Sequence, residues 1–543
     1  MSPLSLSQAA GAVTAATDPT TFIKAPSISY SGMSPILIVL GGACVGVLIE
    51  ALVPRAQRYA SQLTVTVGTL VAALIAVIAL HDRSETTVSG ALAVDGATLF
   101  LQGTILVLAV LSVLLIADRG VEPGSAIVAS AAVTVGSPAD RRLTTSNRIQ
   151  TEVHPLALFA VSGMLIFPAS NNLLLMFVAL EVLSLPLYLM AGLARRRRLL
   201  SQEAAIKYFL LGAFASAFFL YGVALLYGYA NSVDLGTILA AQSTSSHSDS
   251  LLYLGFGLLM VGLLFKAGIA PFHSWTPDVY QGSATPVTSF MASCTKIAAF
   301  GAMLRLFYVG FGADRWDWQP MLWIIAILTM LVGSVLAVVQ TDVKRMLAYS
   351  SVAHTGFLLT GLLGVQATSA LGPHEITSLQ AVLFYLATYG PATVGTFAIV
   401  TLVRDAGGEA TSFAKWSGLG RKSPLVAGAF GFLLLSMAGI PLTAGFVGKW
   451  AVFEVALASG AWPVVIVAIA ASVISVFFYV RVILLMFFAD PVVDGSGVEG
   501  AAVTRPSLLT SATIAVCVAA TLFLGVVPGP VLDLAGNAGS FIR

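Results

Sequence analysis

The chain has 543 residues, of which 57% are hydrophobic and only 10% are charged, and its mean hydropathy is +0.93. These values exclude an ordinary soluble domain and predict an all-α polytopic membrane protein. The net charge of +2 is too small to favour nucleic acid as a partner.

The cysteines and the glycine pattern argue against a metal or redox centre in this chain. Cys44, Cys294 and Cys517 lie in apolar runs without C-x-x-C spacing, so we expect buried structural thiols rather than iron–sulfur ligands or a disulfide framework. No G-x-G-x-x-G follows a strand-like run, and no two membrane histidines have the spacing of paired haem ligands. Any redox cofactor that the protein serves is expected elsewhere.

In chain order, residues 1–34 are rich in Ser, Thr, Ala and Pro and predict a polar tail that is not a cleaved signal. Fourteen apolar stretches of membrane-spanning length follow, at about 35–53, 62–80, 98–117, 153–169, 171–193, 204–230, 251–270, 284–309, 319–339, 345–364, 376–403, 424–457, 461–489 and 508–530. The seventh and twelfth are interrupted by Gly and Pro.

These spans divide the chain into five parts after the tail. The parts are helices 1–3 at 35–118, a loop at 119–152, helices 4–8 at 153–309, helices 9–13 at 319–489 and helix 14 at 508–530. The apolar segment 125–135 is too short to span a membrane, so we assign it to the loop.

The loop cations predict the orientation of the helices. With the N-terminus outside, seventeen loop Lys and Arg residues fall inside and only Lys24, Arg83, Arg315 and Arg543 fall outside. This asymmetry follows the positive-inside rule. The sequence therefore predicts that both termini lie outside and that the 119–152 loop is cytoplasmic.

A short motif occurs twice and suggests an internal repeat. Ala-Gly-Ile-Ala-Pro at 267–271 and Ala-Gly-Ile-Pro at 438–441 each break a long apolar helix, about 170 residues apart. The offset relates helices 4–8 to helices 9–13. A unit of five helices ends on the side of the membrane opposite to its start, so the second unit must be inverted relative to the first. Inverted repeats with a discontinuous helix in each half are typical of transporters.

Basic residues inside the predicted spans are candidate functional residues, because a charged group at the bilayer centre costs about 2.5–3.5 kcal/mol. They are Lys207, Lys266, Lys296, Arg305, Lys449 and Arg481. Lys296 lies at mid-depth, and Lys266 and Lys449 adjoin the two breaks, where half-helix ends offer polar partners. We expect Arg305 and Arg481 to snorkel to the interface. Lys207 lies near one surface, and an interfacial or a functional role fits it equally.

Glu181 is the carboxylate at mid-depth in helix 5. Paired with a lysine it can stay charged, and moving the lysine away would release a proton, because burial disfavours an ammonium without its partner. The 170-residue offset leads from Glu181 to the neighbourhood of His354 in helix 10, an imidazole suited to relay. A core histidine with satisfied hydrogen bonds is the alternative for His354.

Other polar residues lie towards the inner surface. His273 can pass protons between bulk water and Lys266, or it can simply cap a helix. We expect the Arg195–Arg198 run to anchor the topology and to contact lipid phosphates. Glu203 and Lys344 are expected at the same surface, without a special role.

Four segments carry a family resemblance: LEVLSLPLYLMAGL at 180–193, the stretch at 263–300, QTDVKRMLAYSSVAHTGF at 340–357 and MAGIPLTAGFVGKW at 437–450. They resemble the antiporter-like membrane subunits of respiratory complex I, over about residues 35–530. The resemblance implies fourteen helices with two inverted five-helix repeats. It also implies proton translocation driven by quinone reduction in a distant part of the complex.

The same resemblance implies a proton path made of Glu181, Lys207, Lys266, His273, Lys296, His354 and Lys449. Glu181 and Lys266 match the family's glutamate–lysine pair, and Lys296 matches its central lysine. Lys449 matches the lysine of the second broken helix and Lys207 an auxiliary lysine. The two histidines match connecting residues.

The resemblance further implies a non-catalytic subunit of an NADH–quinone oxidoreductase in the bacterial plasma membrane. NADH, FMN, iron–sulfur clusters and quinone are expected in other subunits, and no cofactor or metal in this one. The expected partners are other membrane subunits of the complex and phospholipids. Two alternatives stay open: a subunit of an independent cation/proton antiporter, and a scaffold whose paired lysines are silent.

Overall fold

The computed structural model describes residues 27–542 except 123–124, 129–132, 135, 147–148, 245–248, 365–375, 406–407, 491–500 and 540. Most of the predicted polar tail therefore lies outside the described residues. The N-terminal elements are α1 (Ser34–Leu52), α2 (Arg55–Ala79), β1 (Glu85–Thr87), β2 (Leu92–Val94), α3 (Gly96–Ala117) and α4 (Pro138–Thr145). Strands β1 and β2 pair as an antiparallel hairpin between α2 and α3.

The first predicted repeat contains α5 (Val153–Ala169), α6 (Leu173–Ala191), α7 (Arg198–Ala230), α8 (Leu235–Thr244), α9 (Asp249–Ala267), α10 (Trp275–Gly282), α11 (Thr285–Phe290), the π-helix η1 (Met291–Thr295), α12 (Lys296–Arg305) and the π-helix η2 (Leu306–Gly310). Elements α11 to η2 form one continuous span from Thr285 to Gly310. α9 and α10 are the two parts of the interrupted seventh span.

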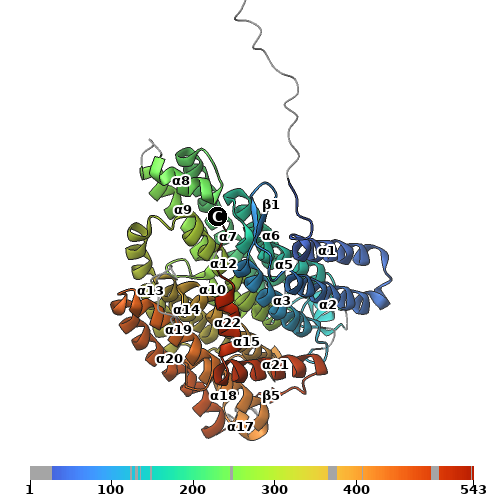
Figure 1. Ribbon diagram of the computed structural model, residues 1–543. Helices are drawn as coiled ribbons and strands as arrows, with labels where there is room; N and C mark the ends of the chain where they lie inside the picture. Colours follow the sequence, from blue (N-terminus) through green and yellow to red (C-terminus); the bar gives the residue numbers. More distant parts are fainter. Residues whose placement is uncertain are drawn as a thin grey trace, which may run out of the picture.

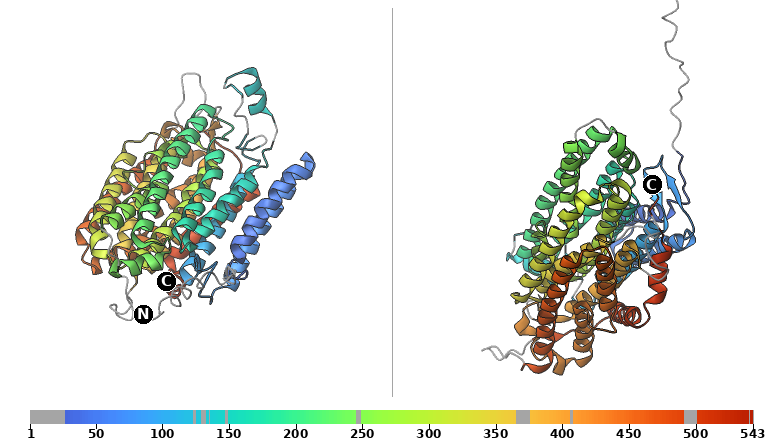
Figure 2. Two further views of the ribbon diagram at one scale, coloured as in Figure 1. Left: turned by 90° about the horizontal axis from the view of Figure 1, so that it is seen from above. Right: turned by 60° about the vertical axis from the view of Figure 1, so that its left-hand side comes forward.

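The second predicted repeat contains α13 (Arg315–Val338), α14 (Val343–Leu362), α15 (Ser378–Leu402), β3 (Val403–Asp405), β4 (Gly408–Glu409), α16 (Phe413–Trp416), α17 (Leu419–Lys422), α18 (Pro424–Ala438), α19 (Ala444–Ala458) and α20 (Trp462–Phe488). The chain then continues through β5 (Ala502–Val503), α21 (Leu508–Val526) and α22 (Gly529–Asn537). Figure 1 shows α1 and α2 at one edge of the helix bundle and α19 and α20 at another, and Figure 2 shows that the long helices run side by side.

Eleven helices of the described part are long and apolar enough to cross a membrane. The other three predicted spans correspond to α5, α14 and the interrupted pair α18–α19. The structure therefore confirms the all-α polytopic fold. The largest differences in the helix starts are those of α2 and α7, which begin at Arg55 and Arg198, each several residues before the predicted start.

The two helix breaks have the same backbone geometry. Gly268 and Gly439 follow the ends of α9 and α18 with φ of +72° and +88°, a left-handed conformation that glycine adopts without steric cost. The amide of the next residue donates to a leucine carbonyl five residues earlier, at 2.9 Å for Ile269 and 3.1 Å for Ile440. The repeated Ala-Gly-Ile motif thus ends a helix in the same way twice.

The loops gather at two ends of the bundle. At one end β3 pairs with β4 and β5, and backbone bridges join Ile127 to Ala194 and Asp342 to Ser412. We name this the basic end, because it holds most of the loop Lys and Arg residues. The other, which holds the β1–β2 hairpin, is the hairpin end. One expectation fails in the helices between them, since Cys44 is exposed while Cys294 and Cys517 are buried.

Glycines set how closely α7 and α9 approach. A Cβ on Gly222 would lie 2.6 Å from the Gly255 carbonyl oxygen and 2.6 Å from the Leu259 amide, a contact that no side chain can occupy. Small residues allow such close backbone contact between membrane helices. Gly222→Leu should therefore force the helices apart, with an overpacking cost of about 3 kcal/mol or more.

The amount of folded chain in membranes and its melting temperature in detergent measure this effect. Gly228→Leu is the matched control, because Gly228 lies on the same helix with open space around its Cβ. Equal yields of the two variants would contradict the packing argument.

Candidate functional site

Three lysine amines lie deep in the described part of the bundle. Lys266, Lys296 and Lys449 are only 3%, 4% and 4% exposed. Each amine has hydrogen-bond acceptors on a neighbouring helix, so none relies on lipid or on the interface. Buried charges persist where such partners are present.

Lys266 lies in the last turn of α9, next to the first break. Its Nζ donates to Ser184 Oγ on α6 at 2.8 Å and to Tyr208 OH on α7 at 3.1 Å. The ring of Tyr208 also lies 5.3 Å from this nitrogen, a distance at which cation–π attraction contributes.

The predicted contact of Lys266 with Glu181 is absent from the ion pairs of the described residues. Glu181 Oε1 is buried without a hydrogen-bond partner, although the carboxylate is near enough for its charge to act on the lysine. Ser184 follows Glu181 by three residues and occupies the same helix face. The serine hydroxyl therefore takes the amine contact that we had assigned to the carboxylate.

Lys296 begins α12, directly after the π-helix η1. Its Nζ donates to the Ser351 carbonyl oxygen at 2.6 Å, to Ser351 Oγ at 2.5 Å and to Thr355 Oγ1 at 2.7 Å. Both acceptor residues lie on α14. Ser351 Oγ also bonds Tyr389 OH on α15 at 2.8 Å. π-Helical turns are frequent at functional sites, so this local geometry fits a working position for the amine.

His354 is buried on α14, between the two residues that accept hydrogen bonds from Lys296. Its Nδ1 lies 2.8 Å from Tyr385 OH and its Nε2 lies 3.3 Å from Tyr479 OH. Tyr479 in turn bonds Ser350. The charges of both Lys296 and Lys449 act on the histidine, so it lies near both amines.

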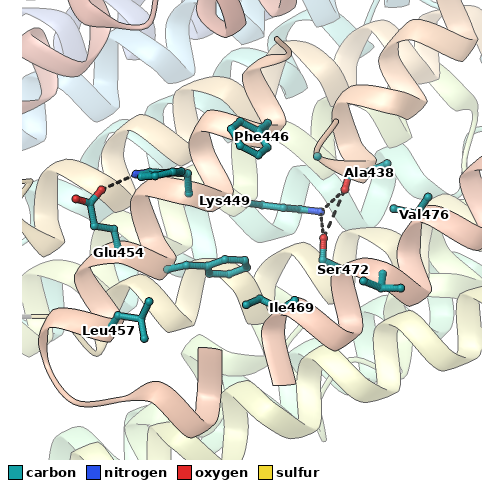
Figure 3. Close-up of a pocket in the computed structure, with 12 residues that line it drawn as sticks. Ala438, Phe446, Lys449, Glu454, Leu457, Ile469, Ser472 and Val476 are labelled. Carbon is teal, nitrogen blue, oxygen red and sulfur yellow. Dashed lines mark hydrogen bonds between the residues drawn. The ribbon is translucent and has the colours of Figure 1, made fainter. Parts of the chain in front are cut away.

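Lys449 lies on α19, beside the second break. Its Nζ donates to the Ala438 carbonyl oxygen at 2.8 Å and to Ser472 Oγ at 2.9 Å. Ala438 is the last residue of α18, so the lysine meets a carbonyl that the break leaves free, as expected. The amine adjoins a pocket of about 520 Å³ (Figure 3). Glu454 also lines this pocket, but its carboxylate accepts a hydrogen bond of 2.6 Å from Trp450 Nε1 and has no hydrogen bond to Lys449 among the described residues.

Lys207 and His273 lie apart from the three deep amines. Lys207, with a side chain 41% exposed, pairs with Glu203 and with Asp278, each at 2.6 Å. Asp278 on α10 also pairs with Arg345 on α14 at 2.7 Å. His273 lies between α9 and α10 with its ring 6.4 Å from that of Tyr349, and no hydrogen bond to Lys266 is present among the described residues.

Four basic residues that we assigned to the surface are buried instead. Arg305 is not exposed at all, so the prediction that it snorkels is wrong. Its guanidinium pairs with Asp95 Oδ2 at 2.6 Å and donates to the Pro168 carbonyl oxygen at 2.7 Å. Internal acceptors thus replace the interface as its polar environment.

The other three lie at the basic end, and one of them, Arg198, is buried in a pair with Asp140. Lys344 is 1% exposed and donates to the Ser283 carbonyl oxygen at 2.7 Å. Arg195, the first residue of the arginine run, is fully buried and donates to the carbonyl oxygens of Ser125 and Ser146. Instead of contacting lipid phosphates as predicted, Arg195 fastens the 119–152 loop to the bundle.

Glu409 on β4 is the counter-charge of Lys344. Its carboxylate lies 3.3 Å from the lysine Nζ and accepts hydrogen bonds from Thr285 N and Oγ1 at 3.2 and 2.6 Å. Burial alone raises the pKa of this carboxyl, but Lys344 and the Thr285 hydrogen bonds outweigh burial and hold the pKa below its usual value.

Because the folded-state pKa of Glu409 is the lower one, the ionised carboxylate stabilises the protein above the unfolded value of about 4.3. This contribution is lost as the pH falls through the folded value. Glu409→Gln should cost about 3 kcal/mol at neutral pH, because it leaves Lys344 buried without its partner, and should make the melting temperature less sensitive to acid.

Melting curves of the detergent-purified protein between neutral pH and about pH 2 test this result, because the contribution of Glu409 is lost only below its unfolded pKa. Asp490→Asn is the control, because Asp490 is 87% exposed in its pair with Arg421 and exposed pairs contribute about 1 kcal/mol or less. An unchanged acid response in Glu409→Gln would refute the assignment.

Sequence reasoning missed the hydroxyl groups that surround the amines, namely Ser184, Tyr208, Ser351, Thr355, Tyr385, Tyr389, Ser472 and Tyr479. One signal was available: Tyr385 and Tyr389 are four residues apart and share one face of a mainly apolar helix. The serines and threonines give no such signal, because they are common in membrane helices.

Residues 170–475 match the family described as NADH:quinone oxidoreductase/Mrp antiporter, TM. The chain is 64% identical over 533 residues to the NADH-quinone oxidoreductase subunit N of a Nocardioides species, covering 96% of this chain and 100% of that protein. It is 58% identical over 524 residues to the protein of the same name from a Parafrankia species, covering 96% and 97%.

Solved structures give the same picture. A chain of respiratory complex I from Thermus thermophilus with bound Aureothin is 34% identical, with a TM-score of 0.73 over 93% of this chain and 100% of that one. A chain of the Mrp complex from a Dietzia species superposes with a TM-score of 0.77 over 94% and 97%, at 22% identity. The second likeness concerns the fold alone.

Proposed function

Because the chain belongs to the NADH:quinone oxidoreductase/Mrp antiporter membrane family, we propose that it translocates protons as a membrane subunit of an NADH–quinone oxidoreductase. It acts as a multi-pass protein of the bacterial plasma membrane, alongside other membrane subunits of the complex. The observation that supports this role most directly is that three buried lysine amines each meet hydroxyl or carbonyl acceptors within the bundle.

The proposed path follows these amines. Protons enter at the basic end near Lys207 and His273, pass through Lys266 and Lys296 and continue past His354 to Lys449. Hydroxyl groups such as that of Ser351 both donate and accept hydrogen bonds, so they can hand a proton on without holding a charge. Glu181 acts on Lys266 through its charge rather than through a direct contact.

The orientation of the path follows from charge. The basic end faces the cytoplasm, because positively charged loops are retained on that side, and both termini lie outside. Moving one proton against 100 mV costs about 2.3 kcal/mol. Withdrawing the partner of a buried charge changes the free energy by about 3–5 kcal/mol, which is sufficient to drive the step.

In this proposed role, the chain contributes no catalytic centre of its own. NADH, FMN, iron–sulfur clusters and quinone belong to other subunits, and their redox energy reaches this chain through electrostatic and conformational coupling. The lysines would change their partners during each cycle, and the carboxylates and hydroxyls around them would set when each proton is bound or released.

Comigration with NADH oxidation tests the assignment to this complex. After gentle solubilisation of the membrane, the chain should migrate in a native gel with NADH-oxidising activity, and vesicles should pump protons with NADH whether or not sodium is present. An independent antiporter would instead migrate apart from that activity and exchange sodium for protons without NADH. Migration with the activity and normal pumping after loss of all three deep amines would favour the scaffold alternative.

A further inference from the structure

A long apolar groove lies outside the path described above. It has a volume of about 920 Å³ and runs between α2, α3, α15, α21 and α22 near the hairpin end. Its walls include Ile78, Leu99, Val107 and Leu534, and none of the three deep lysines lines it. Ile78 and Val107 are 63% and 43% exposed, so the groove opens sideways towards the hydrocarbon of the bilayer.

The length of the groove corresponds to one leaflet. Its lining on α3 extends from Gly96 to Leu108, which is about 18 Å along a helix axis. The hydrocarbon core of a bilayer is about 30 Å thick, so one leaflet contributes about half of that. The groove therefore matches the reach of an acyl chain from the leaflet at the hairpin end.

One mouth of the groove is polar. His81 and Asp82, just beyond the end of α2, line it with side chains that are 74% and 86% exposed and are joined by a contact of 2.9 Å. Asn537 of α22 lines the same end. A polar rim at head-group level above an apolar channel of one-leaflet depth has the shape complementary to an amphiphile.

We propose that this groove binds one phospholipid with an ethanolamine head group, from the leaflet at the hairpin end. Its acyl chains fill the space between the apolar walls, its ammonium pairs with Asp82 and its phosphate accepts a hydrogen bond from His81. The bound lipid joins the N-terminal helices α2 and α3 to α15 and α21 of the second half.

Water and a protein helix fit the groove less well. Apolar cavities stay dry, so water does not fill the space between these apolar walls. A protein helix is a rigid cylinder about 10 Å across and must match the shape of a groove to fill it. Flexible acyl chains adapt to a narrower space, and the bilayer supplies them at high concentration.

A larger side chain at Gly103 should fill the groove. It lines the groove, and a Cβ placed on it would meet only Val77 Cγ1, at the ordinary contact distance of 3.6 Å. Gly103→Leu should therefore fold normally while its side chain fills the acyl site. Gly68→Leu on α2 is the matched control, because Gly68 lies outside the groove with open space around it.

The first experiment measures phospholipid retained per complex after purification in a mild detergent. Gly103→Leu should retain one phosphatidylethanolamine fewer per chain than the wild type, whereas Gly68→Leu should retain the same number. Equal lipid content in all three proteins, or an equal loss in both variants, would overturn the proposal.

The second experiment needs no groove-filling variant. A phosphatidylethanolamine with a photoactivatable acyl chain is added to the wild-type complex in nanodiscs, and cross-linked peptides are mapped. Labelling of Gly96–Ala117 and of α22 should exceed labelling of the exposed face of α7 at least fivefold, and Asp82→Asn should remove the preference over a phosphatidylglycerol probe. Even labelling of all lipid-facing helices, or preferential labelling by a quinone probe, would refute the site.

Discussion

Replacing Lys296 by Met should abolish NADH-driven proton pumping while the complex still assembles. The amine is buried in the bundle and has three hydrogen-bond contacts, all to residues of α14. A methionine side chain fills the space but binds no proton, so the path is cut at its centre. Inverted membrane vesicles with a pH-sensitive dye should show at least a tenfold lower NADH-driven gradient, with the ATP-driven gradient unchanged.

Lys296→Arg distinguishes the loss of a proton carrier from the loss of a structural positive charge. Arginine keeps the positive charge but is not deprotonated in proteins, so it should also fail to pump if protons pass through this side chain. A merely structural cation would tolerate the change. Lys422→Met is the control, because Lys422 lies exposed at the basic end. Undiminished pumping by Lys296→Met in an intact complex would remove the residue from the path.

Arg305→Met should cause the largest loss of stability. Arg305 and Asp95 are 0% and 1% exposed and lie 2.6 Å apart, so the substitution leaves a carboxylate buried without its counter-charge. Breaking such a pair costs about 3–5 kcal/mol, a large part of the about 5–15 kcal/mol that stabilises a folded domain. The yield of assembled complex and its melting temperature should both fall sharply.

A double variant tests the physical reason. Asp95→Asn combined with Arg305→Met removes both charges and keeps an oxygen to cap α3, where Asp95 now accepts from Thr98 N. The double variant should be more stable than Arg305→Met alone. Arg83→Met, which breaks an exposed pair with Glu85, should change stability by about 1 kcal/mol or less. A double variant as unstable as the single one would show that the guanidinium acts by packing.

The elements that the sequence predicted well are those with local causes. Apolar length predicted the spans, and the repeated Ala-Gly-Ile predicted both breaks, because each depends on a few adjacent residues. The burial of Lys296 followed from its depth in its span, and that of Lys266 and Lys449 followed from their position beside the two helix breaks. Function at family level followed from long motifs around these residues.

The failures concern partners that are distant along the chain. Arg305 was expected at the interface because Asp95, more than 200 residues earlier, is not visible as a partner in the sequence. Arg195 was assigned to lipid because nothing local shows that the 119–152 loop folds over it. The contact of Lys266 with Ser184 instead of Glu181 depends on rotamers that residue spacing does not determine.

The position of Lys296 has a mechanical consequence. The lysine belongs to the first five-helix unit, but every oxygen that holds its amine belongs to α14 of the second. If Lys296 carries protons as proposed, sliding one unit past the other would stretch these contacts and would couple the relative motion of the two units to release of the proton. The contact between the two units would then link their relative position to whether Lys296 holds a proton.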